Sequence, residues 1–239
     1  MPNNYFKFKQ FTAHQDKCAM KVCTDACLFG AWIANRLLFT ANRGLDIGCG
    51  TGLLSLMLAQ KLNDVNIDAV EIDEAAAQQA NENFEASPWK DRLHIQNISI
   101  QQFVETVTYK YDVIISNPPF YESDLKSDDA KRNLALHSSE LKLEELISIA
   151  DKLLNDGGNF FILMPYYRTN EFERLIKGKF CTKEKVYVKQ TERHNYFRSM
   201  FCLSRQTYST TQSEMIIMNK DGGYTNEFAA LLRDYYLYL

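Results

Sequence analysis

The sequence has no apolar run of about 18 residues, the length that a membrane-spanning helix needs. Its N-terminal stretch, Met1–Lys7, lacks the charged-then-apolar order of a secretory signal peptide. Internal repeats and low-complexity segments are also absent. These absences argue against a membrane protein, a secreted protein and a repeat protein, and we expect a cytoplasmic chain.

The six cysteines lack the spacing of a zinc site, since Cys18, Cys23 and Cys27 are separated by four and then three residues. Reduced, buried thiols are typical of a chain that is not secreted, and we expect no metal. The net charge of −3 argues against a surface that is basic all over. Local basic patches could still bind nucleic acid.

The composition supports one full-size hydrophobic core. The chain has 239 residues, of which 46% are hydrophobic, 24% charged and 13% aromatic. A domain of this length buries roughly three quarters of its unfolded surface. We therefore expect a single domain over residues 1–239, with an N-terminal covering segment (1–42), a catalytic core (43–205) and a C-terminal strand and helix (206–239).

From about residue 43 onward, short apolar runs alternate with helical stretches, which is typical of a parallel sheet with crossover helices. The expected strands cover 44–47, 65–71, 93–96, 111–116 and 160–164, and the expected helices cover 53–62, 74–84 and 141–154. Asn155–Gly158 is expected to close the last of these helices with glycines at positive φ.

The later part of the chain follows a different pattern. Strands over 185–189 and 196–203 are joined by only a few residues and must form an antiparallel hairpin. A strand over 214–218 and a helix over 226–239 follow. The prediction is an α/β, Rossmann-like fold: a mostly parallel, seven-stranded sheet with a C-terminal antiparallel hairpin and helices on both faces.

A glycine-rich turn, Asp46–Gly52, follows the first strand and leads into a helix. The carboxyl end of a strand is where an open α/β sheet binds ligands, and glycines let the backbone approach a ligand closely. Leu53 breaks the dinucleotide fingerprint, and the lysine of a phosphate loop is missing. A nucleoside that carries an amino acid and a sulfonium fits, with Asp46 near the methionine end and Glu71 at the ribose hydroxyls. The alternative is a plain structural turn beside a surface carboxylate.

The tetrapeptide Asn117-Pro118-Pro119-Phe120 follows the fourth strand at the same edge of the sheet, and its two prolines make it rigid. An amine on a purine ring is a poor nucleophile because its lone pair is delocalised. Hydrogen bonds from the amine to the Asn117 side-chain oxygen and the Pro118 carbonyl would localise that lone pair. Phe120 would stack on the base, worth about 1–3 kcal/mol. We predict that these four residues are catalytic; the alternative is a double proline in an ordinary loop.

With these motifs, the chain resembles the tRNA1(Val) (adenine-N6)-methyltransferases, class I enzymes that modify the adenosine immediately 3′ of the anticodon. The resemblance spans nearly the whole chain and includes Phe8–Phe11, His14–Asp16, Lys21–Trp32, Asp46–Gly52, Ser116–Phe120 and Tyr224–Phe228. It implies S-adenosylmethionine as the cofactor and tRNA as the partner. A monomer with no metal and no membrane is also expected.

The resemblance also implies a set of cofactor-binding residues. These are Lys21, Thr24, Asp25, Asp46, Gly48, Cys49, Gly50, Gly52, Glu71, Ile72, Ser99, Ile100 and Asn117. The first three lie over the methionine end of the cofactor in such enzymes. Family members have glycine where this chain has Cys23 and Ala26, and commonly an acidic residue at Ser99. The Ser99 hydroxyl can still accept a hydrogen bond from the cofactor adenine, and Asn97 is the alternative for that contact.

Residues 177–205 contain eight basic and two acidic side chains, a local balance of +6, and residues 1–24 are also basic. Both segments would have to border the catalytic edge to bind RNA phosphates. The expected substrate-binding residues are Phe120, Tyr121, Arg193 and Arg198. A solvated charged face is the alternative for the basic segment. The polar stretch 121–137 is predicted to be a lid.

Four other functions remain open at this point. A protein glutamine amide has the same delocalised lone pair and could use the same Asn-Pro-Pro clamp. Methylation of a DNA adenine or of a ribosomal guanine amine would use the same chemistry. A non-catalytic RNA-binding protein could retain the cofactor fold, although the intact Asn117 and Phe120 argue against it.

Overall fold

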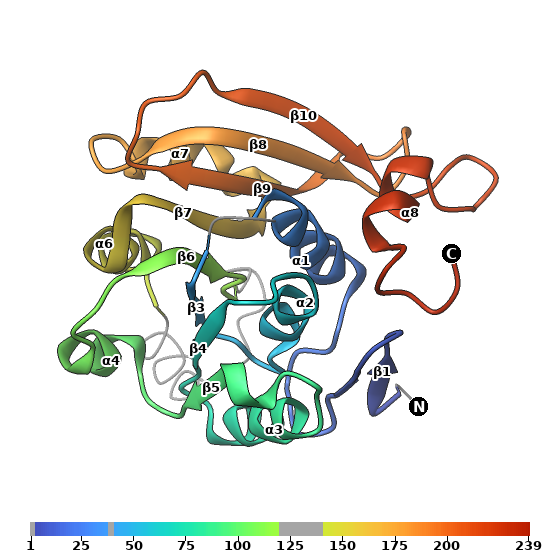
Figure 1. The fold of residues 1–239 in the computed structure, drawn as a ribbon. Coiled ribbons are helices and arrows are strands. Elements are labelled where there is room, and N and C mark those ends of the chain that lie inside the picture. Colours follow the sequence, from blue (N-terminus) through green and yellow to red (C-terminus); the bar gives the residue numbers. More distant parts are fainter. Residues whose placement is uncertain (1–2, 38–40, 120–140) are drawn as a thin grey trace, which may run out of the picture.

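The computed structural model describes residues 3–37, 41–119 and 141–239 (Figure 1). Its centre is an eight-stranded sheet in the order β10-β8-β9-β7-β6-β3-β4-β5. Five strands are mutually parallel: β3 (Arg43–Ile47), β4 (Asn66–Val70), β5 (Leu93–Gln96), β6 (Tyr111–Ser116) and β7 (Leu154–Pro165). We call the side of the sheet at which these strands end the carboxyl edge, and the opposite side the amino edge.

Three further strands extend the sheet beyond β7, and of these only one runs against the others. β9 (Tyr196–Ser204) runs antiparallel between β7 and β8 (Cys181–Lys189). β10 (Thr211–Ile216) pairs with β8 in parallel and is the outermost strand at this end of the sheet order. The predicted α/β, Rossmann-like architecture is therefore confirmed, and β10 adds an eighth strand to the seven expected.

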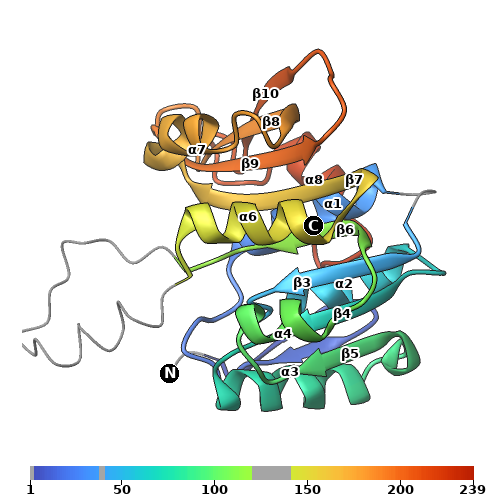
Figure 2. The same cartoon turned by 90° about the vertical axis from the view of Figure 1, so that its left-hand side faces the viewer.

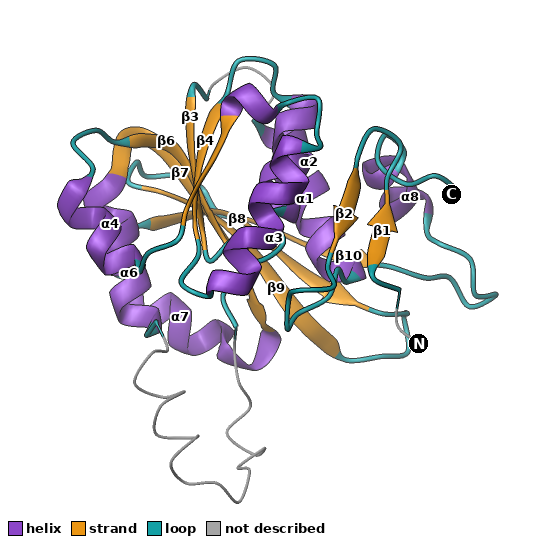
Figure 3. Cartoon of the chain, turned by 90° about the horizontal axis from the view of Figure 1, so that it is seen from below, coloured by secondary structure: helices purple, strands orange, loops and turns teal. Residues whose placement is uncertain are grey.

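Helices cover both faces of the sheet, as Figures 2 and 3 show from two directions. One face carries α1 (Thr24–Arg36), α2 (Leu53–Lys61), α3 (Glu74–Glu85) and α8 (Asn226–Leu232). The other face carries α4 (Ile100–Thr106), α6 (Leu143–Leu153) and α7 (Thr169–Leu175). Short 3-10 turns lie at η1 (Lys90–Arg92) and η2 (Tyr166–Arg168).

The two helical layers bury a separate core on each face of the sheet. Alternate residues of β6 divide between the two cores: Val113 and Ile115 pack beneath α1 and α2, whereas Ile114 packs beneath α4 and α6. Burial on both faces explains why the central strands β6 and β7 contain the continuous apolar runs 113–115 and 160–164.

The sequence missed the structure of the N-terminal segment. Residues before α1 form a small antiparallel hairpin, β1 (Tyr5–Lys7) with β2 (Thr12–His14). Phe8 bridges to Tyr236, so the hairpin packs against the C-terminal end of the chain. The expected C-terminal helix is correspondingly short: it ends at Leu232, and Tyr235 is buried in the turn beyond it with its hydroxyl donating to the Met57 carbonyl at 2.9 Å.

The prediction for Gly157 and Gly158 was wrong, because neither has a positive φ. Helix α6 ends at Leu153, and β7 begins at the next residue. A Cβ on Gly158 would lie 2.9 Å from the Asp112 carbonyl oxygen and 2.9 Å from a Leu154 methyl. Gly158 therefore serves the close approach of β7 to β6, not a helix cap.

All six cysteines are free, as expected. Four are buried (Cys18, Cys27, Cys49 and Cys202), whereas Cys23 is exposed and Cys181 is half-buried, so burial was overpredicted for these two. In the described part of the chain, no group of three or more histidine, cysteine or carboxylate side chains could hold a metal ion. No helix within those residues combines the length and apolar character that a membrane crossing needs.

Candidate functional site

Four strands end in one row at the carboxyl edge. Their pairing places in register Ser116, Ile47, Val70 and Gln96. The residues that follow are therefore neighbours at this edge: Asn117, Gly48, Glu71 and Asn97. The Ser116 hydroxyl also donates to the Ile47 carbonyl at 2.9 Å, which ties the start of the Asn117 loop to the start of the glycine turn.

The glycine turn has the backbone geometry that its sequence predicts. Gly48, Gly50 and Gly52 have φ values of 71°, 55° and 76°, a left-handed region that costs other residues energy. A Cβ on Gly48 or Gly50 would meet nothing within 4 Å, so the backbone here faces open space. A Cβ on Gly52 would instead lie 2.4 Å from the Phe84 ring. The first two glycines leave room for a ligand, and the third leaves room for α3.

Asp46 lies at the end of β3 and is fully buried. The Ser55 hydroxyl donates to one carboxylate oxygen of Asp46 at 2.7 Å, and the other oxygen has no partner. Burial, opposed by the Ser55 hydrogen bonds, raises the pKa of Asp46 to about 7. A buried carboxylate with one unused oxygen is suited to a cationic or hydrogen-bond-donating ligand group.

Glu71 follows β4 and is held in place from two sides. Its carboxylate accepts from the Gly50 backbone N–H at 2.9 Å and from the Asp73 backbone N–H at 3.0 Å. The Asn97 amide donates to the carbonyls of Glu71 and Ile72 at 2.9 and 3.2 Å. Each carboxylate oxygen keeps lone pairs for a ligand, and the neighbouring Ile72 side chain is 59% exposed.

Ser99 and Ile100 begin helix α4, beside Asn97. The Ser99 hydroxyl accepts from the Gln102 backbone N–H at 3.2 Å, and the Ser99 backbone N–H donates to the Gln102 side-chain oxygen at 3.2 Å, which completes a capping box. Ile100 is buried beneath the cap. Both Ser99 and Asn97 therefore have structural hydrogen bonds, and the choice between them as a ligand contact stays a prediction.

The N-terminal segment is fastened to the glycine turn by buried polar side chains of α3. The Asn83 amide donates to the carbonyls of His14 and Thr51, both at 2.9 Å, and its oxygen accepts from the His14 N–H at 2.9 Å. Gln79 accepts from the Lys17 backbone N–H at 3.1 Å. Burial and the nearby Glu71 carboxylate raise the pKa of the Cys18 thiol to about 11. Residues 14–18 therefore lie beside the turn and Glu71.

Lys21, Thr24 and Asp25 continue this segment into helix α1. The Lys21 ammonium donates to the carbonyls of Gln15 and Cys18, so it stabilises the segment itself. Asp25, in the first turn of α1, is buried and accepts from the Arg198 guanidinium at 2.7 Å. Arg198 pairs with Pro165 at the carboxyl end of β7, which places this ion pair at the same edge as the glycine turn.

The motif predicted to be catalytic is described in part. Asn117 is half-buried, Pro118 is buried and Pro119 is exposed. Phe120, Tyr121 and the expected lid over 121–137 lie outside the described residues. The described part of the loop leaves β6 beside the glycine turn of β3, so the two predicted motifs are neighbours.

The basic segment divides between the two edges of the sheet. Cys181 pairs with Ser204 at the amino edge, so Lys177, Lys179 and Arg205 lie far from the catalytic loop. Four of the eight cations pair with carboxylates outside the segment: Lys185 with Glu173, Lys189 with Glu214, Arg198 with Asp25, and Arg205 with Asp151 and Asp156. Arg193 is exposed at the β8–β9 turn on the carboxyl side. The condition for a continuous RNA-binding patch is therefore only partly met.

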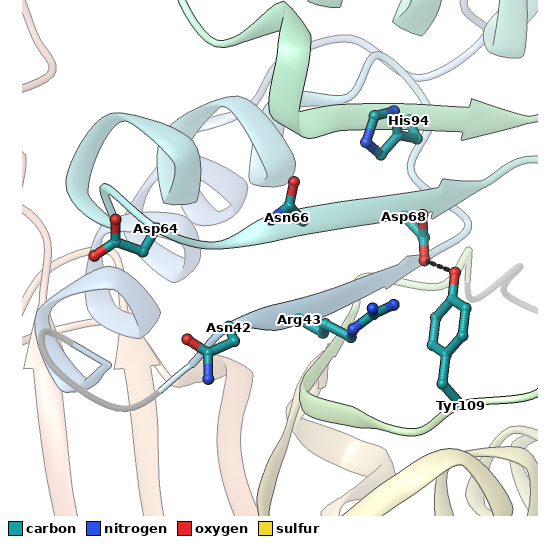
Figure 4. Close-up of a pocket in the computed structure, with 7 residues that line it drawn as sticks. All are labelled: Asn42, Arg43, Asp64, Asn66, Asp68, His94 and Tyr109. Carbon is teal, nitrogen blue, oxygen red and sulfur yellow. Dashed lines mark hydrogen bonds between the residues drawn. The ribbon is translucent and has the colours of Figure 1, made fainter.

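A polar hollow of about 590 Å³ lies elsewhere, at the amino ends of β3 and β4 (Figure 4). It is lined by Asn42, Arg43, Asp64, Asn66, Asp68, His94 and Tyr109. The Tyr109 hydroxyl donates to Asp68 at 2.9 Å. We do not place the site there, because the row of strand ends, the open glycine turn and the unpartnered Asp46 oxygen all belong to the opposite edge.

Sequence reasoning missed three residues that build the site. Ser55 fixes one oxygen of Asp46, and Asn83 and Gln79 fasten the N-terminal segment. Ser55 lies on the predicted helix after the turn, and polar residues on a buried helix face are a usable signal. The partners of Asn83 and Gln79 are more than 30 residues away, and no local pattern indicates them.

Comparisons with known proteins agree with this geometry. The family model "Methyltransferase small domain" matches residues 28–197. A curated tRNA1(Val) (adenine(37)-N6)-methyltransferase from Cytophaga hutchinsonii is 41% identical over all of both chains, and one from Dyadobacter fermentans is 43% identical over 99% of each. The crystal structure of a predicted O-methyltransferase from Agrobacterium tumefaciens aligns with a TM-score of 0.67 at 16% identity, covering 87% of this chain and 95% of the other, which supports the fold alone. The chain belongs to the methyltransferase small domain family, in the group of the tRNA1(Val) (adenine(37)-N6)-methyltransferases.

Proposed function

We propose that this protein transfers a methyl group from S-adenosylmethionine to the exocyclic N6 amine of an adenine in tRNA, the adenosine 3′ of the anticodon of tRNA1(Val). The observation that carries the proposal is the pairing of Ile47 with Ser116, from which the glycine turn and the Asn117 loop leave as neighbours. A methyl donor on one loop and an amine on the other would then face each other. The names of the full-length relatives support the choice of substrate.

The described residues fit the cofactor. Gly48 and Gly50 leave open space at the turn, where a ligand backbone can approach. The free oxygen of Asp46 suits the methionine ammonium group of the cofactor, and the lone pairs of Glu71 suit the two ribose hydroxyls. In this proposal Lys21, Thr24 and Asp25 act mainly by covering the cofactor at the glycine turn.

S-adenosylmethionine, when bound, supplies an electrophilic methyl group on its sulfonium. The role of the protein is to make the amine nucleophilic and to aim it. The Asn117 side-chain oxygen and the Pro118 carbonyl each accept one N–H of the amine, which draws its lone pair out of the ring. Residues 46–52 and Glu71 would hold the cofactor, and the proton that the amine loses on methylation would pass to water. No strong base is required, because the methylated nitrogen is acidic until that proton leaves.

The proposal includes the wider setting of the reaction. The partner is tRNA, the enzyme acts in the cytoplasm as a monomer, and one domain over residues 1–239 carries the whole activity. Support for the single domain comes from the N-terminal hairpin and α8, which pack on the same core as α1 and α2. Sedimentation of the protein with and without tRNA tests the monomer.

The direct test uses S-adenosylmethionine with a radiolabelled methyl group. The protein is incubated separately with total RNA, DNA and protein from cells that lack the modification. We expect label in RNA, recovered as N6-methyladenosine after digestion. Label found only in protein would identify a glutamine methyltransferase, and label found only in DNA would move the substrate to DNA adenine. An Asn117→Ala variant serves as the control for contaminating enzymes.

A further inference from the structure

Three tyrosines from separate elements meet on the face of the sheet that carries α7. Tyr166 belongs to η2, Tyr187 to β8 and Tyr196 to β9. Their ring centroids lie 5.1 Å (Tyr166 to Tyr187), 5.0 Å (Tyr166 to Tyr196) and 5.3 Å (Tyr187 to Tyr196) apart. All three residues are half-buried, so part of each remains accessible to solvent. We call this group the tyrosine cluster.

The tyrosine cluster lies at the carboxyl edge. Tyr166 comes directly after Pro165, the last residue of β7, and Ile162 of the same strand pairs with Ser116. Tyr196 is the first residue of β9 and pairs with Lys189 at the end of β8. Strands are spaced by about 4.8 Å, so β9 and β8 lie about 10 and 14 Å from β6, which carries the Asn117 loop. Figure 2 shows α7, which follows η2, on the side toward which β3 and β4 point.

The cluster has features that hydrophobic packing alone does not require. The core beneath it is made by buried rings such as Phe172 and Phe201, whose centroids are 5.0 Å apart. The Lys189 ammonium lies 4.4 Å from the Tyr196 ring centroid, and the Lys185 ammonium lies 5.6 Å from that of Tyr187. Both lysines pair with glutamates, at 3.0 and 2.7 Å. The glutamates therefore largely neutralise the attraction of these lysines for phosphate. The tyrosine rings are the main feature here that suits a nucleotide base.

We propose that the tyrosine cluster is a stacking platform for RNA nucleotides that flank the target base. This inference rests on the proposed function and adds substrate-binding residues to it. Bases stack on aromatic side chains whatever their sequence. Unstacked loop nucleotides next to the target base can span the distance between the Asn117 loop and the cluster. Tyr167, which follows Tyr166 in the sequence, is 64% exposed.

The test compares Tyr187→Leu and Tyr196→Leu with Tyr187→Phe. Leucine preserves apolar packing but removes the ring, whereas phenylalanine keeps the ring. We expect the KM for an unmodified tRNA to rise at least about fivefold in each leucine variant, as stacking on one ring predicts. The KM for S-adenosylmethionine should change less than twofold, roughly the scatter expected for an untouched site. The phenylalanine variant should remain near wild type.

A matched control exists at the opposite edge. Tyr208 also has a lysine over its ring, with the Lys183 ammonium 5.1 Å from the centroid, and it is 38% exposed. Its loop follows β9, whose Ser204 pairs with Cys181 at the amino edge. Tyr208→Leu should leave the KM for tRNA unchanged. An equal rise in this variant would contradict a role specific to the cluster.

A second measurement uses only the wild-type protein, so it does not depend on whether the variants fold. Wild-type protein is cross-linked by ultraviolet light to tRNA that carries 4-thiouridine, and the attached peptides are identified by mass spectrometry. Cross-links within 166–168 or 187–196 support the platform. Cross-links confined to other segments, together with an unchanged KM for tRNA in the leucine variants, overturn the platform. The proposed function still stands in that case if wild type methylates RNA. A wild type that methylates no RNA instead overturns the proposed function.

Discussion

Asp46 gives the account its most quantitative prediction, because its buried carboxylate couples folding, pH and cofactor binding. Its pKa rises from the model-peptide value of 3.8 to about 7 in the folded protein. A difference of this size corresponds to about 4 kcal/mol between the two protonation states. Because the pKa is raised in the folded state, the contribution of Asp46 to the free energy of unfolding is fully present below pH 3.8. This contribution is lost as pH rises through about 7.

The perturbation is Asp46→Asn, which keeps the shape of the side chain and an oxygen for the Ser55 hydroxyl but removes the titration. We expect the free energy of unfolding of wild type, relative to the variant, to fall by several kcal/mol between about pH 4 and pH 7. Saturating S-adenosylmethionine should oppose this fall in wild type, because the charged carboxylate attracts the cofactor ammonium.

Urea unfolding at several pH values, with and without cofactor, measures both effects. Calorimetry of cofactor binding gives a second readout: the affinity of wild type should increase as pH rises through about 7, whereas that of the variant should be weaker and flat. Parallel pH profiles of unfolding for the two proteins would refute the reasoning. Equal cofactor affinity at high pH would show that Asp46 does not face the ligand.

Three further predictions concern single residues. Asn117→Ala should lower kcat by about 100-fold or more, as for the loss of a group that acts in the transition state, and leave the cofactor Kd nearly unchanged; single-turnover kinetics checks this, and a near-normal kcat would reject the assignment. Gly52→Ala should lower Tm more than Gly50→Ala, since its Cβ meets the Phe84 ring at 2.4 Å whereas Gly50 has open space; Gly50→Ala should instead weaken cofactor binding. Asn83→Ala should speed amide hydrogen exchange over 12–18 and weaken cofactor binding, since it leaves the His14 and Thr51 carbonyls without this donor.

The sequence predicted the site better than its surroundings. The parallel strands are short apolar runs, and their carboxyl ends must share one edge, so the neighbourhood of Gly48, Glu71 and Asn117 follows from local patterns. Helix α1 was missed because it is buried on nearly every side, from Asp25 to Ala34, and has no amphipathic period. The N-terminal strands span only three residues each, and besides pairing with each other they are held by Asn83 of α3.

Charge was the feature that the sequence predicted least well. The balance of +6 over 177–205 counts only neighbours in the chain. In the folded protein, Lys185 and Lys189 meet Glu173 and Glu214. Arg198 meets Asp25, which is 173 residues away in sequence. Ion pairs between distant segments leave no local signal, and they decide whether a basic run is an open patch.

In the proposed reaction, the glycine turn and the Asn117 loop hold the methyl donor and the amine face to face. A crystal structure of the protein with S-adenosylhomocysteine and an adenine-containing RNA stem–loop tests it directly. We predict the cofactor product along residues 46–52 and Glu71, with the adenine amine at hydrogen-bond distance from Asn117 and pointing at the sulfur. A cofactor product seated elsewhere, such as in the hollow beside Asp68, or an adenine amine turned away from Asn117, would contradict the account.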